Sequence, residues 1–169
     1  TGSDSGGGIL ASGYNCRLSI TNNRVVANYG TYGGGIRVGH TALTAANGYT
    51  SGVNNGVVID HNWVSQNGAS EIASGDGGGG GVTLGTGSNN YSVSKNYVCG
   101  NFSMSDGGGV SHVGLSAGSN TIIDNKIILN QTFNQAADPT GGGSFIGGPT
   151  ALPGTVTAGT GNVSVARNL

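Results

Sequence analysis

Four of the seven acidic residues stand one to three positions ahead of glycine clusters: Asp4, Asp76, Asp106 and Asp138. The simplest interpretation is structural, because an Asp ahead of Gly accepts backbone hydrogen bonds and forms turns. If the clusters stack on one another, Asp76 and Asp106 instead approach the ~5–5.5 Å carboxylate separation of a retaining glycosidase. The same carboxylates would suit Ca²⁺, which binds oxygen ligands. The aspartates therefore predict either turns or a catalytic or Ca²⁺-binding pair.

Insertions of variable length carry the residues best suited to binding. They span residues 40–56, 68–78, 131–140 and 148–161. Their candidate binding residues are Tyr49, Glu71, Phe133 and Asp138, surrounded by Gly, Ala, Thr and Pro. Loops with so little charge favour docking to a glycan or to another protein over cation-driven catalysis, and insertions in repeat proteins cluster on the binding face. The alternative is that these loops have no binding role and are accommodated because long surface loops cost little stability.

A nine-residue repeat must position all of these side chains. It has the form apolar-x-x-Asn-x-apolar-x-x-Asn and occupies residues 20–28, 59–67, 93–101 and 122–130, with a fifth start at 165–168. Side chains on one face of a strand recur every second residue, so each spacing of three indicates a bend. An Asn at a bend can bond its own turn and the Asn of the next repeat. The repeat therefore predicts three short strands with stacked asparagine ladders at two bends.

Glycine clusters fall between the repeats, and four of them are followed by an apolar residue: Ile9, Ile36, Val82 and Val110. Glycine in such places marks a tight turn or a close approach of two backbones. The clusters therefore predict the point where the chain enters the next strand.

Three titratable residues of different type share one position of the repeat. His61, Lys95 and Asp124 each precede the first Asn. Stacked repeats would place them on one outward stripe, where a Lys95–Asp124 pair contributes at most about 1 kcal/mol. The alternative is a general acid/base trio in which His61 titrates near neutrality.

The glycine clusters and the asparagine repeat together resemble those of the right-handed parallel β-helix repeat proteins. This pectate-lyase-like superfold also includes bacterial surface and autotransporter-type passenger solenoids. The resemblance covers essentially the whole chain and implies an all-β, right-handed parallel β-helix of about five coils with asparagine ladders. A β-sandwich is the main rival, but it needs antiparallel strands and no Asn at fixed spacing.

The resemblance implies a fold rather than one activity, because the superfold holds polysaccharide lyases, glycoside hydrolases, adhesins and inert stalks. Its uronate-cleaving lyases combine Ca²⁺-binding acids with a Lys or Arg base. No such base can be placed beside the aspartates here. We therefore expect a structural or binding scaffold, and the alternative is a polysaccharide-active enzyme, either lyase or glycoside hydrolase, that uses Asp76 and Asp106.

The amino-acid composition limits the kinds of molecule that the protein is expected to bind. Glycine contributes 36 of 169 residues, so few segments can propagate a helix. The 6 basic residues are scattered and the formal net charge is −1, which argues against binding of nucleic acid. No apolar run approaches the ~18 residues of a membrane span. We expect an extracellular or cell-surface protein whose partner is a polysaccharide or another protein chain.

The sequence also supports predictions about the chain ends, the two cysteines and the remaining histidines. Residues 1–169 are expected to form a single β-helix segment, either a fragment of a longer chain or a module with covered ends, because neither end has a capping pattern. Uncapped coils would permit end-to-end or subunit packing. Cys16 and Cys99 lie two coils apart, beyond the ~7 Å Cα limit of a disulfide, and are expected to be buried free thiols. His40 and His112 lack metal-ligand spacing, so no cofactor is expected beyond Ca²⁺ at the aspartates.

Overall fold

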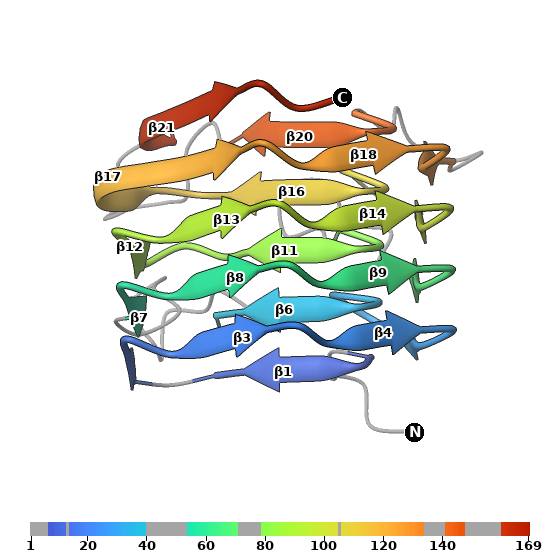
Figure 1. The fold of residues 1–169 in the computed structure, drawn as a ribbon, viewed down its shortest axis with the longest axis horizontal. Helices are drawn as coiled ribbons and strands as arrows, with labels where there is room; N and C mark the ends of the chain where they lie inside the picture. Colours follow the sequence, from blue (N-terminus) through green and yellow to red (C-terminus); the bar gives the residue numbers. More distant parts are fainter. Residues whose placement is uncertain are drawn as a thin grey trace, which may run out of the picture.

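A computed structural model describes residues 7–12, 14–39, 54–70, 79–104, 106–133, 141–147 and 160–169. Within these residues the regular structure is all β-strand, and every strand pairing is parallel. Strands from successive repeats stack above one another (Figure 1), as expected for a β-helix or solenoid. The same described residues contain no helix long and apolar enough to cross a membrane.

The described strands form five sheets. One contains β1 (Ile9–Ala11), β6 (Ile36–Val38), β11 (Val82–Leu84), β16 (Val110–Val113) and β20 (Ser144–Gly147). A short one contains β2 (Asn15–Cys16), β7 (Asn54–Asn55) and β12 (Ser88–Asn89). The third contains β3 (Ser19–Thr21), β8 (Val58–Asp60), β13 (Ser92–Ser94), β17 (Ser116–Ile123) and β21 (Gly161–Ala166). The fourth contains β4 (Arg24–Val26), β9 (Trp63–Ser65), β14 (Tyr97–Cys99) and β18 (Lys126–Ile128). The fifth contains β5 (Tyr29–Gly30), β10 (Gly68–Ala69), β15 (Phe102–Ser103) and β19 (Gln131–Thr132).

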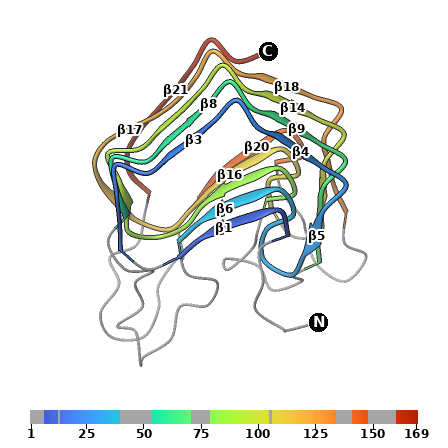
Figure 2. The same ribbon diagram turned by 60° about the horizontal axis from the view of Figure 1, so that its bottom comes forward.

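One circuit of the chain is longer than the repeat alone. After β3 the chain passes through β4, β5, β6 and β7 before β8 pairs with β3. The three strands that flank the asparagine bends are as predicted, and β6 follows its glycine cluster. In Figure 2 the sheet of β3 and the sheet of β4 appear as two sides that meet at a corner. The β7 strand has only two residues, which is too short for a periodic pattern to reveal.

The interior is filled by the apolar positions of the repeat. Parallel register aligns Ile20, Ile59, Val93, Ile122 and Val165 in one row. A second row aligns Val25, Val64, Val98 and Ile127. The central members of both rows are fully buried. Because side chains alternate along each strand, the residues that flank these inward positions in the same strands face outward.

Two ladders of side-chain amides run through the stack, as predicted. In the first, each Nδ2 donates to the next Oδ1 at 2.9–3.0 Å, through Asn23, Asn62, Asn96, Asn125 and Asn168. In the second, the same contact at 2.9–3.0 Å joins Asn28, Asn67, Asn101 and Asn130. Each accepting oxygen also receives the backbone N–H of the preceding ladder residue, for example that of Asn62 at 2.9 Å. The ladders therefore satisfy polar groups that the bends would otherwise leave buried and unpaired.

The bends themselves have a left-handed backbone. The residue before each first-ladder Asn has φ between 52° and 58°: Asn22, His61, Lys95, Asp124 and Arg167. This conformation costs an ordinary residue roughly 1–2 kcal/mol. The hydrogen bonds made by the side-chain amide of the following Asn offset that cost. The bend also turns the side chain of the left-handed residue outward.

The glycine clusters mark close contact between successive backbones. A Cβ at Gly34 would lie 2.4 Å from the carbonyl oxygen of Gly80 and 2.5 Å from the amide nitrogen of Gly68. No side chain fits between these backbones. This confirms the interpretation that the clusters permit a close approach.

Candidate functional site

The most distinctive outward surface lies on the sheet of β4, β9, β14 and β18. In each strand the middle residue points inward, so the first residue points outward. Strand register aligns these first residues in one row: Arg24, Trp63, Tyr97 and Lys126. We call this row the aromatic column, because two neighbouring rings occupy its centre and a cation stands at each end.

The two rings form a pair that remains accessible to solvent. Their centroids are 4.4 Å apart and their planes are inclined by 41°. Trp63 is 48% exposed, and its Nε1–H donates to Ser65 Oγ at 2.9 Å. The hydrogen bond fixes the orientation of the indole while about half of its surface stays exposed.

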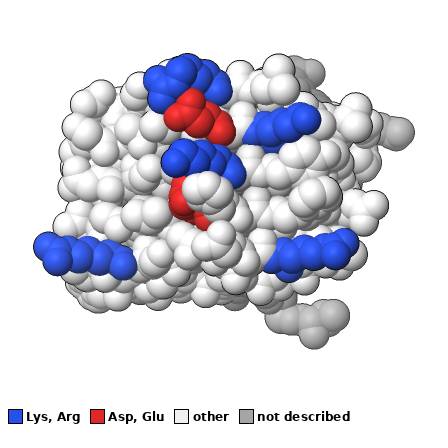
Figure 3. Space-filling view, viewed as in Figure 1, with Lys and Arg blue, Asp and Glu red and all other residues white. Residues whose placement is uncertain are grey.

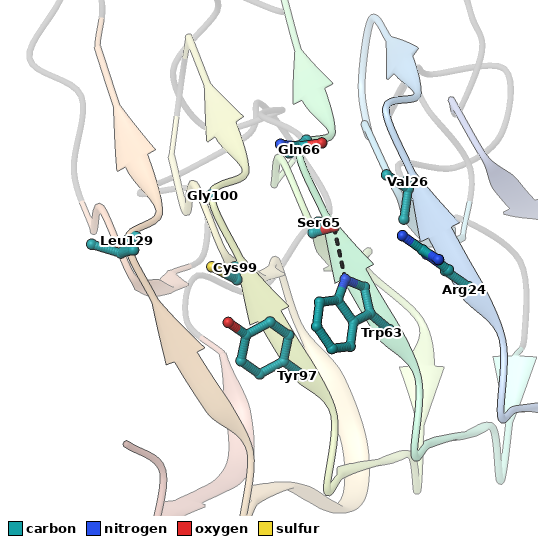
Figure 4. A pocket seen from close by; sticks show the side chains of 9 residues that line it. All are labelled: Arg24, Val26, Trp63, Ser65, Gln66, Tyr97, Cys99, Gly100 and Leu129. Carbon is teal, nitrogen blue, oxygen red and sulfur yellow. Dashed lines mark hydrogen bonds between the residues drawn. The ribbon is translucent and has the colours of Figure 1, made fainter.

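A pocket of about 410 Å³ opens at this ring pair. Ser65 and Cys99 line it beside the rings, and Leu129 and Arg24 lie at opposite sides (Figure 4). A hydrogen bond with Cys99 raises the pKa of the Tyr97 hydroxyl above its ordinary value of 10, so the ring stays neutral at physiological pH. The pocket thus combines apolar faces with small polar groups, as ligand sites do.

Both ends of the aromatic column are positively charged. Lys126 Nζ lies 5.8 Å from the Tyr97 ring centroid, a cation–π contact. Arg24 and Lys126 are exposed, and neither has an acidic partner within 4 Å among the residues that the structure describes. In Figure 3, basic groups lie over the right-hand part of the face with uncharged surface between them.

A separate stripe of charges runs along the first bends, at the middle of the face in Figure 3. This charged stripe consists of Asp60, His61, Lys95, Asp124 and Arg167. Arg167 donates to both oxygens of Asp124, at 2.7 and 2.8 Å. Besides these hydrogen bonds from Arg167, the charge of Lys95 also lowers the pKa of Asp124, so the predicted Lys95–Asp124 pair acts alongside this direct contact. The guanidinium of Arg167 can donate two parallel N–H groups to the two carboxylate oxygens, which the single ammonium of Lys95 does less well.

The predicted acid/base trio does not assemble on this stripe. The imidazole Nδ1 of His61 contacts the carboxylate of Asp60, its sequence neighbour. Hydrogen bonds from Ser94, and then from His61, hold the pKa of Asp60 below its ordinary value. The bond from Arg167 does the same for the pKa of Asp124. These carboxylates are therefore ionised partners within a solvated ladder of charges.

The aspartates ahead of the glycine clusters are described only in part. Asp106 is buried, with 7% of its surface exposed, whereas Asp4, Asp76 and Asp138 lie outside the described residues. The proposed carboxylate pair of Asp76 and Asp106 therefore stays a prediction. Among the described residues, no group of three or more His, Cys, Asp or Glu side chains is placed to hold a metal ion.

Of the binding residues predicted in the insertions, Phe133 is described and Tyr49, Glu71 and Asp138 are not. Phe133 is exposed and stacks on Phe102, with ring centroids 5.8 Å apart. Phe102 also contacts Tyr29, at 6.2 Å. Phe133 thus belongs to a second aromatic cluster, beside the sheet of β5, β10, β15 and β19.

Both cysteines are free thiols, as predicted, but the expectation that both are buried is wrong. Cys16 is exposed because β2 is the edge strand of its sheet and this residue occupies the outward position. Cys99 is partly buried beside Tyr97. Neither sulfur is shielded from solvent as fully as the apolar side chains of the interior rows.

The aromatic column was not anticipated from the sequence, although a signal for it was present. Trp63 and Tyr97 each follow a first-ladder Asn by one residue, so the repeat already assigns them to one outward row. Comparison with known proteins finds no matching family model, no significantly similar curated protein and no significantly similar solved structure.

Proposed function

We propose that this chain forms a right-handed parallel β-helix of about five coils that binds a glycan on the aromatic column. A right-handed path is the rule for parallel crossover connections, which supports the handedness. We further propose that the scaffold works outside the cell or at the cell surface. The observation that carries the function is the accessible Trp63–Tyr97 pair beside a pocket.

The chemistry of the pair suits a sugar. The faces of pyranose rings present C–H groups, which pack on aromatic rings, while their hydroxyls need polar partners. Ser65 and Gln66 supply such partners at the same pocket. The rings stand on paired strands with fully buried apolar residues beneath them, so little ordering is needed when a ligand binds.

Affinity gel electrophoresis tests this function. Native gels containing carboxymethyl-cellulose, hydroxyethyl-cellulose, dextran or dextran sulfate should retard the wild-type protein in at least one case. Trp63→Ala should weaken that retardation by about tenfold, because an anchoring aromatic at the centre of a site contributes most of the affinity. Tyr14→Ala is the matched control, because Tyr14 is 88% exposed and does not line the pocket.

The outcomes are distinct. Loss for Trp63→Ala together with wild-type retardation of Tyr14→Ala supports the proposal. Absence of retardation in every gel, or equal retardation of Trp63→Ala and wild type, contradicts it. Circular dichroism of both variants establishes that the fold is retained.

A further inference from the structure

The charges of the aromatic column extend the proposed function to a class of ligand. Arg24 and Lys126 stand three strand positions apart in one register-aligned row, with both rings between them. At ~4.8 Å per strand, the row is roughly 14 Å long. It runs across the strands, along the direction in which they stack. An elongated ligand lying on the rings would therefore pass both cations.

Among the residues that the structure describes, acidic side chains do not neutralise this row. The nearby carboxylates of the described chain belong to the charged stripe, where Asp60 contacts His61 and Asp124 contacts Arg167. Lys95 lies within electrostatic reach of both carboxylates. The negative and positive charges of the charged stripe thus balance one another. The positive charges of Arg24 and Lys126 remain available to a ligand.

The geometry points to an anionic glycan, whose carboxylate or sulfate groups meet Arg24 and Lys126 while its sugar rings pack on Trp63 and Tyr97. This inference rests on the proposed function. The guanidinium of Arg24 presents a fork that matches an oxyanion, whereas Lys126 offers a single mobile charge. The two ends of the row therefore differ, and a bound chain would have a preferred direction.

The test compares polymers that share a backbone and differ in charge. Binding of carboxymethyl-cellulose and of hydroxyethyl-cellulose is measured by isothermal titration calorimetry at low salt, with dextran sulfate and dextran as the sulfated pair. Wild type should prefer the anionic member of at least one pair by about tenfold, and added salt should reduce the preference through screening. Which pair shows the preference identifies carboxylate or sulfate as the recognised group.

Charge-removing variants locate the effect. Arg24→Gln and Lys126→Gln should each weaken binding of the anionic polymer by about fivefold, and should weaken binding of the neutral polymer less than that. Arg17→Gln is the matched control, because it removes one exposed positive charge at the bend between β2 and β3. Wild-type binding by this variant supports the inference.

Two results would overturn the inference. In the first, the charged and neutral polymers of both pairs bind equally and Trp63→Ala still abolishes binding, so the glycan function stands but the charge selectivity does not. In the second, Arg17→Gln weakens binding as much as Arg24→Gln, which shows unspecific attraction to total charge. Absence of binding to all four polymers would instead remove the proposed function itself.

Discussion

At the scale of single residues, the ladder asparagines determine where the chain bends. Asn96 donates from Nδ2 to Asn125, and also to the carbonyls of Ile59 and Ser94, each at 2.9 Å. Its Oδ1 accepts both the backbone and the side-chain N–H of Asn62. No other short side chain offers donors and an acceptor in this arrangement. The left-handed residue before each Asn is tolerated because the amide secures the turn.

An interior ladder position should therefore be more sensitive than a position at the end of the row. Asn96→Ala is expected to lower the free energy of unfolding by about 3 kcal/mol, because it leaves several buried groups unpaired. Asn23→Ala should cost about 1 kcal/mol, because Asn23 is exposed. Urea unfolding monitored by circular dichroism measures both values. Similar losses at the two positions would show that burial of the ladder does not set its energetic contribution.

At the scale of elements, each three-residue strand divides its side chains between the interior and one outward face. In β8 the inward Ile59 is fully buried, whereas its neighbour Val58 is 38% exposed. The same alternation places Val64 inside and Trp63 outside in β9. Interior packing and surface chemistry can therefore vary independently along one strand.

The two neighbours in β8 form a matched pair for this division. Ile59→Ala should destabilise the protein by about 2–4 kcal/mol, because it opens a cavity in the buried row. Val58→Ala should cost under about 1 kcal/mol, within the range of strand propensity on an exposed face. Thermal or urea unfolding of both variants gives the comparison. A larger loss for Val58→Ala would require the assigned inward and outward faces to be exchanged.

How far the sequence predicts the structure differs between these elements. The asparagine spacing was enough to predict the strands around Asn23 and Asn28, because the change of parity at a bend is a local property. It gave no sign of β7, since two residues cannot show a period. The direct contact between Asp124 and Arg167 was not predicted, because the choice between Lys95 and Arg167 as the closer cation depends on side-chain geometry across coils. The aromatic column could have been found by applying the repeat to every outward position, since Trp63 and Tyr97 are in register.

At the scale of the whole molecule, one buried histidine connects segments that are far apart in the sequence. His112 of β16 is fully buried; its Nε2 donates to the carbonyl of Thr160 at 3.0 Å, and its Nδ1 accepts from the Tyr91 hydroxyl at 2.8 Å. Burial lowers the pKa of His112, although backbone contacts at Thr160 and Gly114 oppose the shift. Burial also raises the pKa of Tyr91. The pair is therefore neutral in the folded protein.

This pair makes stability depend on pH. Below about pH 6.5 the unfolded chain takes up a proton on His112 that the folded chain resists. Stability should therefore be fully present above pH 6.5 and fall as the pH is lowered through that value toward 5. Urea unfolding at pH 7.5 and pH 5 measures the difference. The double variant Tyr91→Phe with His112→Leu should show a smaller difference, and an unchanged one would assign the effect to other groups.

The first ladder also has a consequence for how coils can join. Each amide-to-amide hydrogen bond in it has the same direction: the Nδ2 of one Asn donates to the Oδ1 of the Asn in the coil that follows, from Asn23 to Asn168. The ladder therefore has a direction, because all of its amide-to-amide hydrogen bonds are oriented the same way. A coil that continued the row at either face would have to keep the same polarity, because a flipped coil would set oxygen against oxygen. Any stacking of such segments through their ladders would proceed in one direction only.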